Sequence, residues 1–186
     1  PLNDADKSEQ GNFNFHLMPI LKSYDLVDWT YVGDALQSKP SWVASDAGLW
    51  APDIRYFNGQ YYLYYAASWT SLPGGGSAIG VATSTSPAGP WVDSGAPVVE
   101  PHAPPCCAND KRWVFDPAVI TDEAGQMWMF YGSYFGGISA RKLSADGLHT
   151  DPASQAQITS SNKYEAPFVV KKNGYYYLFV SATDCC

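Results

Sequence analysis

Two carboxylates stand near the starts of two similar sequence segments. Asp116 lies in "VFDPAV" and Glu165 in "YEAPFV", and each is close to a proline that begins an apolar run. Two carboxyl groups that face one space can work as an acid and a base, one giving a proton to a leaving oxygen while the other helps water to attack. Together with aromatic rings that stack on sugars, such a pair suits the hydrolysis of glycosidic bonds.

The two acids belong to three similar segments. They read "LWAPDIRYFNGQYYLYYAAS" from Leu49, "VFDPAVITDEAGQMWMFYGS" from Val114 and "YEAPFVVKKNGYYYLFVSAT" from Tyr164. Each has a proline near its start, a short apolar run, a turn that contains glycine and then a second, aromatic run. Asn-Gly in the first and third segments is a direct signal for a hairpin turn. The pattern therefore predicts three β-hairpins built on one plan.

In this alignment the acids replace apolar residues. Glu165 takes the place of Trp50 and Phe115, whereas Asp116 takes the place of Ala51 and Ala166. Each acid alone has an ordinary explanation, because Asx-Pro often begins a turn and a glutamate at a strand edge is often solvated. Their occurrence at neighbouring repeat positions favours a shared function.

The residues between the hairpins predict further strands. "SAIGVATSTSPAGPWVDSG" follows the first hairpin and "GGISARKLSADGLHT" the second, each supplying a third strand and another strand-like piece, while residues 15–36 predict the outer half of an earlier blade. Four strands per unit, repeated radially, is the plan of a β-propeller. We therefore predict an all-β fold and treat residues 1–186 as one domain incomplete at both ends: the outer part of blade 1, blades 2 and 3, and the start of blade 4.

A propeller would bring the acids together, because the first strand of each blade lines the central channel. Composition agrees with this fold: aromatic residues make up 15% of the 186 residues, with 7 Trp and 13 Tyr, and strands are enriched in such residues. We expect Trp29, Trp91 and Trp128 to lie in the core between the strands.

Charge and hydropathy exclude several classes of partner. The formal net charge is −7 and the 11 lysines and arginines are scattered, which disfavours binding to nucleic acid. An apolar run of about 18 residues, as a membrane span requires, is missing. The cysteines form two adjacent pairs, Cys106-Cys107 and Cys185-Cys186, a spacing unlike that of zinc ligands. We expect structural or free cysteines and no metal site, although an even count permits disulfides.

Longer motifs resemble a known family. "LWAPDI", "FDPAVITDEAGQMWMFYGSYFGGI" and "YEAPFVVKKNGYYYLFVSATDCC" are similar to glycoside hydrolase family 43, the five-bladed propeller hydrolases of arabinan and xylan. The combination of "GSYFGGI" with "EAPF" and the final "CC" is similar to the arabinan-cleaving members. The resemblance implies a secreted, monomeric enzyme that hydrolyses α-1,5-linked arabinan or arabino-oligosaccharides with inversion; its partner would be arabinan or another polysaccharide of hemicellulose or pectin side chains.

The resemblance also implies roles for individual residues. Glu165 would be the general acid, and Asp116 the carboxylate that modulates and orients that acid. Trp50 would border the sugar subsite where cleavage occurs. The expected neighbouring contacts to substrate are Trp69, Ser133 and Tyr134.

Two parts of the family's machinery are not found in this sequence. The general base of the family is an Asp-Pro aspartate that would precede Pro1; Asp4 and Asp6 lie in a polar stretch without this motif, and neither is assigned to the role. The chemistry needs no cofactor, but the resemblance implies that a calcium or sodium ion can occupy the channel, with ligands outside this chain. His16, His102 and His149 do not match the family's histidine, and we expect ordinary roles for them.

Two other functions fit the same motifs. A β-xylosidase or arabinofuranosidase acting on xylan-derived substrates would share every carboxylate and differ at the channel rim. A non-catalytic carbohydrate-binding propeller would keep the aromatic channel and lack the base. Because the base is not found here, we expect the 186-residue chain by itself to be inactive.

Overall fold

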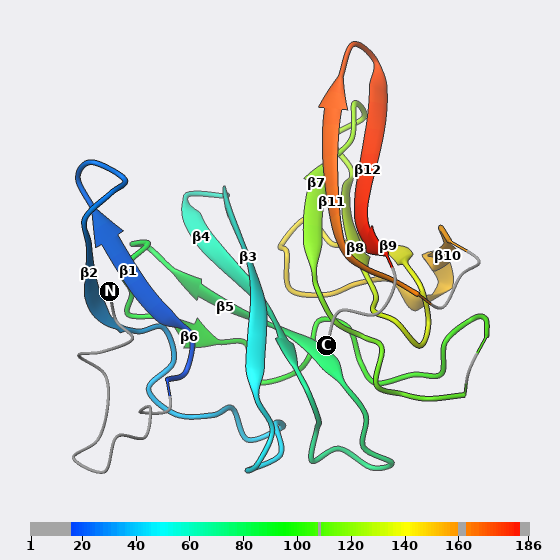
Figure 1. The fold of residues 1–186 in the computed structure, drawn as a ribbon, viewed down its shortest axis with the longest axis horizontal. Helices are drawn as coiled ribbons and strands as arrows, with labels where there is room; N and C mark the ends of the chain where they lie inside the picture. Colours follow the sequence, from blue (N-terminus) through cyan, green and yellow to red (C-terminus); the bar gives the residue numbers. More distant parts are fainter. Residues whose placement is uncertain (1–15, 108, 160–162, 183–186) are drawn as a thin grey trace.

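The computed structural model describes residues 16–107, 109–159 and 163–182, and these residues form antiparallel sheets that follow one another along the chain (Figure 1). The first sheet is a hairpin, the next two have four strands each, and the last is again a hairpin. The strands are β1 (Pro19–Ser23), β2 (Trp29–Asp34), β3 (Leu49–Phe57), β4 (Gln60–Ala67), β5 (Ala78–Ser84), β6 (Val92–Asp93), β7 (Ala118–Thr121), β8 (Met127–Tyr131), β9 (Ser139–Leu143), β10 (Ala156–Gln157), β11 (Tyr164–Lys172) and β12 (Tyr175–Ala182).

This order confirms the all-β prediction and the predicted division into blades. Strands β3 to β6 pair in chain order and so do β7 to β10, so each four-stranded sheet is one complete blade of a propeller. A short 3₁₀-helix, η1 (Pro152–Ser154), precedes β10. Within the predicted segment, residues 145–148 form a turn and Thr150 makes a single antiparallel bridge to Leu143, whereas the fourth strand of blade 3, β10, follows the 3₁₀-helix.

The turns of two hairpins have the backbone that their sequences demand. Asn58 and Gly59 have φ of 50° and 77°, and Asn173 and Gly174 have φ of 52° and 79°. Positive φ at both central residues defines the type I′ turn, whose twist matches that of the flanking strands. These turns fix the register of β3 against β4 and of β11 against β12.

The core lies between the sheets rather than within one of them. Strand β4 contributes to two apolar clusters: Leu63 and Tyr65 face β1 and β2, whereas Tyr62 and Tyr64 face blade 3. A strand buried on both faces must be apolar at successive positions, which explains the run "QYYLYYAA". Blade 2 is thus held on both sides, and its strand ends are fixed relative to blade 3.

The first strands of the blades share an unusual backbone at their starts. Ala51, Asp116 and Ala166 directly precede prolines and have φ of 50°, 54° and 52°. Residues other than glycine rarely adopt this left-handed conformation. In β3 and β11 the pairing register also shifts here, between Trp50 and Asp53 and between Glu165 and Phe168. The predicted repeat alignment is therefore confirmed at the level of individual backbone angles.

The first and last sheets along the chain, β1-β2 and β11-β12, each leave one face uncovered. On β11 and β12, Phe168, Tyr175 and Phe179 are 58%, 68% and 60% exposed. Trp29 on β2 is 50% exposed, so its assignment to the core is wrong, because no strand packs over that side of the hairpin in the described part of the chain. Trp91 is buried as expected. Among the described residues there is no helix long and apolar enough to cross a membrane.

Candidate active site

The structure brings Asp116, Glu165 and Ser133 together where the first strands of blades 3 and 4 begin. Glu165 is the second residue of β11, and its Oε2 accepts a hydrogen bond from the Ser133 hydroxyl at 3.1 Å. Asp116 lies two residues before β7, and its Oδ2 accepts a hydrogen bond from the Ala166 amide at 3.0 Å. Asp116 is thereby bonded to the residue next to Glu165, so one acid is held against the backbone that carries the other.

The surroundings of Asp116 favour its protonated form. Burial raises the pKa of Asp116 from 3.8 to about 6, and the negative charge of Glu165 adds to this rise, whereas the hydrogen bond from Ala166 opposes it. Loss of hydration penalises the ionised carboxylate, and so does a like charge nearby. Asp116 is therefore a carboxyl group that can change its charge near neutral pH.

Ser133 is positioned by backbone hydrogen bonds to the segment that contains Trp113 and Phe115. Its amide donates to the carbonyl of Trp113 at 3.0 Å, and the neighbouring Gly132 amide donates to the carbonyl of Phe115 at 2.8 Å. The Trp113 side chain is buried, and its indole N–H donates to the carbonyl of His102 at 2.8 Å. The Ser133 hydroxyl, which is predicted to contact sugar, donates its hydrogen bond to Glu165.

Replacing Ser133 with alanine is expected to lower kcat about tenfold with little change in KM, because Glu165 loses a hydrogen bond that holds its orientation. Ser139→Ala is a matched control: Ser139 is also buried on blade 3, and within the described structure its hydroxyl has no hydrogen-bond partner. Steady-state kinetics of the two variants measure the difference. Equal activity of both variants would contradict the orienting role of Ser133.

Half-buried aromatic rings lie at the end of blade 2 where its first strand, β3, begins. Trp50 and Trp69 are each 41% exposed, and the Trp50 ring centroid is 5.3 Å from that of Phe115. Tyr134 is more buried and meets the ring of Phe135 edge-on at 5.4 Å. The two tryptophans retain accessible ring surface for a sugar, whereas part of Tyr134 serves packing.

The indole of Trp69 lies against a glycine-rich loop. A Cβ atom on Gly75 would come within 2.6 Å of the Trp69 ring, and Gly75 has φ of 57°. Glycine is required here for two reasons, since the backbone is left-handed and the ring approaches it closely. The loop is thus a support that holds Trp69 in place.

The sequence reasoning missed a third acid, Asp53. It is the fourth residue of the strand start that reads Trp50-Ala51-Pro52-Asp53, and it forms an ion pair with Arg55. The same repeat alignment that indicated Asp116 and Glu165 could have found it. In "LWAPDIRYF", however, Asp53 and Arg55 also fit the polar face of an alternating strand.

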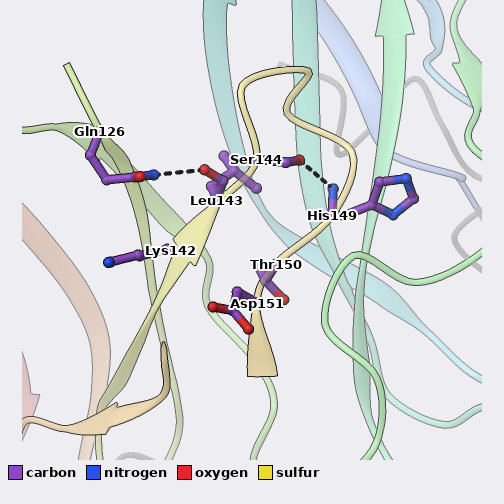
Figure 2. Close-up of a pocket in the computed structure, with 7 residues that line it drawn as sticks. All are labelled: Gln126, Lys142, Leu143, Ser144, His149, Thr150 and Asp151. Carbon is purple, nitrogen blue, oxygen red and sulfur yellow. Dashed lines mark hydrogen bonds between the residues drawn. The ribbon is translucent and has the colours of Figure 1, made fainter. Parts of the chain in front are cut away.

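A hollow of about 320 Å³ lies between the first strands of blades 2, 3 and 4. Both Asp53 and Asp116 line it, together with the three prolines of the strand starts. Another hollow, of about 380 Å³, lies at the opposite end of blade 3 (Figure 2). There the side-chain amide of Gln126 donates to the Leu143 carbonyl, and the backbone amide of His149 donates to the Ser144 hydroxyl. None of the predicted site residues lines this second hollow.

The side chains of two histidines, His16 and His102, have local hydrogen-bond partners. His16 bonds Asp34 at 2.8 Å, and His102 bonds the carbonyl of Glu100 at 2.8 Å, with a pKa lowered by burial. His149 lines the second hollow. In the described part of the chain no group of three or more His, Cys, Asp or Glu side chains could hold a metal ion.

Cys106 and Cys107 form a disulfide between adjacent residues, and the Cys106 sulfur also contacts the carbonyl of Gly136 at 3.6 Å. The pair is therefore a structural disulfide rather than free thiols. Cys185 and Cys186, like Asp4 and Asp6, lie outside the described residues.

Comparison with protein families gives a match over residues 9–186 to glycosyl hydrolases family 43. An extracellular exo-α-(1→5)-L-arabinofuranosidase of Cellvibrio japonicus is 36% identical over 90% of this chain and 53% of its own length. An extracellular endo-α-(1→5)-L-arabinanase of Bacillus subtilis is 34% identical over 90% of this chain and 52% of its own length. The chain thus spans about half the length of these relatives.

Solved structures give the same result. The structure of a Cellvibrio cellulosa α-L-arabinanase complexed with arabinohexaose superposes with a TM-score of 0.71 and 34% identity, over 90% of this chain and 59% of the other.

Proposed function

The chain belongs to glycosyl hydrolases family 43, a family of five-bladed propellers, and from this premise we propose that the protein containing it hydrolyses α-1,5-linked arabinan or arabino-oligosaccharides. The observation that carries the proposal is the pairing of Glu165 with Ser133 beside Asp116, at the start of two adjacent first strands. We propose Glu165 as the general acid and Asp116 as the residue that orients it.

The chemistry follows from the arrangement of these groups. Glu165 gives its proton to the glycosidic oxygen as the bond to the anomeric carbon breaks, and a water molecule supplies the new bond from the opposite face of the sugar. A base must accept the proton of that water, and none of the described residues is assigned to this role. The hydrogen bond from Ser133 keeps the carboxyl of Glu165 in one orientation, and no cofactor is needed for these proton transfers.

The substrate class is supported by the relatives and by the aromatic rings. The two relatives described above are named for action on α-1,5-linked arabinose polymers, and both are named extracellular. Trp50 and Trp69 offer half-exposed rings at the end of blade 2 that carries the strand start, and sugar rings present apolar faces that stack on such surfaces. We propose a secreted enzyme with these tryptophans as sugar platforms.

Displacing Trp69 is expected to weaken substrate binding. In Gly75→Ala the added Cβ would meet the indole ring, whereas in Gly74→Ala it would meet only the Lys111 ammonium, at 3.1 Å. Both glycines have positive φ, so both variants carry a similar backbone cost of about 1 kcal/mol. We expect Gly75→Ala to raise KM for arabino-oligosaccharides roughly fivefold more than Gly74→Ala does. Equal KM values in the two variants would contradict a platform role for Trp69.

Product analysis tests the proposed function. Linear 1,5-α-arabinan is incubated with the protein that contains this chain, and the released sugars are separated over time by chromatography. A mixture of short oligomers indicates endo action, and arabinose or one fixed oligomer indicates exo action; the relatives include both types. No release from arabinan, with release from xylan-derived substrates, would favour the β-xylosidase or arabinofuranosidase alternative. Binding to arabinan without any release would favour a carbohydrate-binding propeller.

A further inference from the structure

The three strand starts hold one acid each, at three different positions of the same four-residue pattern. Glu165 is first in its pattern, Asp116 is second and Asp53 is fourth. The patterns are Trp50-Ala51-Pro52-Asp53, Phe115-Asp116-Pro117-Ala118 and Glu165-Ala166-Pro167-Phe168. The proposed mechanism uses the first two acids and leaves Asp53 without a function.

Asp53 bonds blade 2 to blade 3. Its Oδ2 accepts a hydrogen bond from the Val119 amide at 2.8 Å and another from Arg55 Nε at 3.0 Å, while its Oδ1 lies 3.0 Å from Arg55 Nη2. The Asp53 side chain is only 18% exposed. Both carboxylate oxygens are therefore occupied, and the paired arginine fixes the orientation in which one of them faces β7.

The bulge at the start of β3 makes this contact available. Trp50 pairs with Ala66 and Asp53 pairs with Tyr64, so three steps along β3 correspond to two along β4. One additional residue in a strand resets the alternation of its side chains. Trp50 and Asp53 consequently point to the same face, the one toward blade 3, where Trp50 meets Phe115 and Asp53 meets Val119.

The same kind of hydrogen bond joins the next pair of blades, blades 3 and 4. Asp116 of blade 3 accepts from the Ala166 amide of blade 4, just as Asp53 of blade 2 accepts from the Val119 amide of blade 3. In each case an acid at the start of one first strand bonds the backbone at the start of the next. Val119 is three residues beyond Asp116 on the same strand start, and its side chain is buried between the blades.

We propose that Asp53 is a positioning residue, which sets the place of Asp116 and through it the geometry of the acid pair. This inference rests on the proposed function. Losing the bond to Val119 would release the start of β7 from blade 2 and let Asp116 move relative to Ala166 and Glu165. A displacement of about 1 Å in a catalytic group can cost on the order of a hundredfold in rate.

The experiment compares Asp53→Ala and Asp53→Asn in the protein that contains this chain. Asparagine keeps an oxygen that can accept from Val119 but loses the charge that pairs with Arg55. Glu123→Gln is the control, because Glu123 of blade 3 forms an ion pair with Lys171 of blade 4 at 3.0 Å, at the far end of β11. Each variant is assayed with an arabino-oligosaccharide and with an aryl arabinofuranoside that has a good leaving group. Hydrogen exchange of the peptide covering residues 114–121 is measured alongside.

We expect Asp53→Ala to lower kcat on the oligosaccharide at least about tenfold with KM within about twofold, and to lower kcat on the aryl glycoside less, since a good leaving group needs little protonation. Exchange at residues 114–121 should accelerate. Asp53→Asn should recover part of the rate, and Glu123→Gln should leave rates and exchange unchanged.

Two results would overturn the inference. One is an equal fractional loss on both substrates, as lower stability alone would give; the other is unchanged exchange at residues 114–121 in Asp53→Ala. If the unsubstituted protein hydrolyses neither substrate, the proposed function fails, and the exchange result still decides whether Asp53 holds the strand start that carries Asp116.

Discussion

Glu165→Gln is expected to lower kcat on arabino-oligosaccharides by roughly a thousandfold, while the dissociation constant for the same sugars changes little. Glutamine keeps the shape of the side chain and an oxygen that can accept from Ser133, but it has no proton to give to the glycosidic oxygen. General acid catalysis contributes about 10²- to 10⁴-fold to such reactions. Steady-state kinetics give kcat, and calorimetry with an arabino-oligosaccharide gives the dissociation constant.

The leaving group provides the control for this prediction. The phenolate of an aryl arabinofuranoside with an acidic phenol leaves without full protonation by the enzyme. Glu165→Gln should therefore retain far more of its activity on that substrate than on the oligosaccharide. Near-normal turnover of the oligosaccharide would remove Glu165 from the role of general acid. An equal loss on both substrates would indicate damage to the site as a whole.

Asp116→Asn is expected to lower kcat by about a hundredfold and, at the same time, to stabilise the folded protein at pH 7. The activity falls because the residue that orients Glu165 loses its charge. The stability rises because burial, aided by the charge of Glu165, raises the pKa of Asp116 to about 6. Ionisation of this carboxyl at pH 7 is therefore unfavourable for the folded state, and asparagine avoids that cost.

The pH dependence follows from the sign of the pKa change. In the folded state Asp116 has a pKa of about 6 instead of 3.8, so between these values the folded protein holds more protons than the unfolded chain. Its contribution to stability is fully present below about pH 4 and is lost as the pH rises through 6. A difference of about two in pKa corresponds to roughly 3 kcal/mol, and partial contact with solvent reduces this to about 1–2 kcal/mol.

Thermal unfolding of the two proteins at pH 4 and pH 7 measures this effect. The advantage of Asp116→Asn over the unsubstituted protein should be present at pH 7 and small at pH 4. The asparagine oxygen can still accept from the Ala166 amide, so the seam between blades 3 and 4 stays bonded in the variant. A variant that is less stable than the unsubstituted protein at pH 7 would contradict the burial of an ionised Asp116.

The hairpins and the order of the blades could be predicted because their signals are local. Asn58-Gly59 and Asn173-Gly174 demand a particular turn, and the aromatic run that follows each turn predicts the second strand of the hairpin. The equivalence of Ala51, Asp116 and Ala166 could also be predicted, and it holds for their φ angles. In each case the information lies within a few residues of the feature.

The partner of Ser133 could not be predicted, because it depends on contacts between distant segments. The amide of Ser133 donates to the carbonyl of the buried Trp113, and its hydroxyl donates to Glu165 on another blade. Asp53 was missed because Asp53 and Arg55 fit the polar face of an alternating strand, and the bond from Asp53 to Val119 on another blade leaves no signal in the sequence. The error at Trp29 has another origin, since the aromatic residue was expected to be covered and that face of β2 is open.

The three strand starts share one backbone conformation whether or not they carry an acid at that position, so a blade can fold without its functional side chain. Alanine adopts the left-handed conformation at two of these starts and aspartate at the third, so the carboxylate is not what creates the kink. A duplicated blade would therefore already contain the left-handed strand start at which a functional side chain can be placed. An acid can then be gained, lost or moved between strand starts by point substitution, because the backbone that holds it does not depend on it. The same strand starts are positions at which a designer could place other functional side chains around the channel.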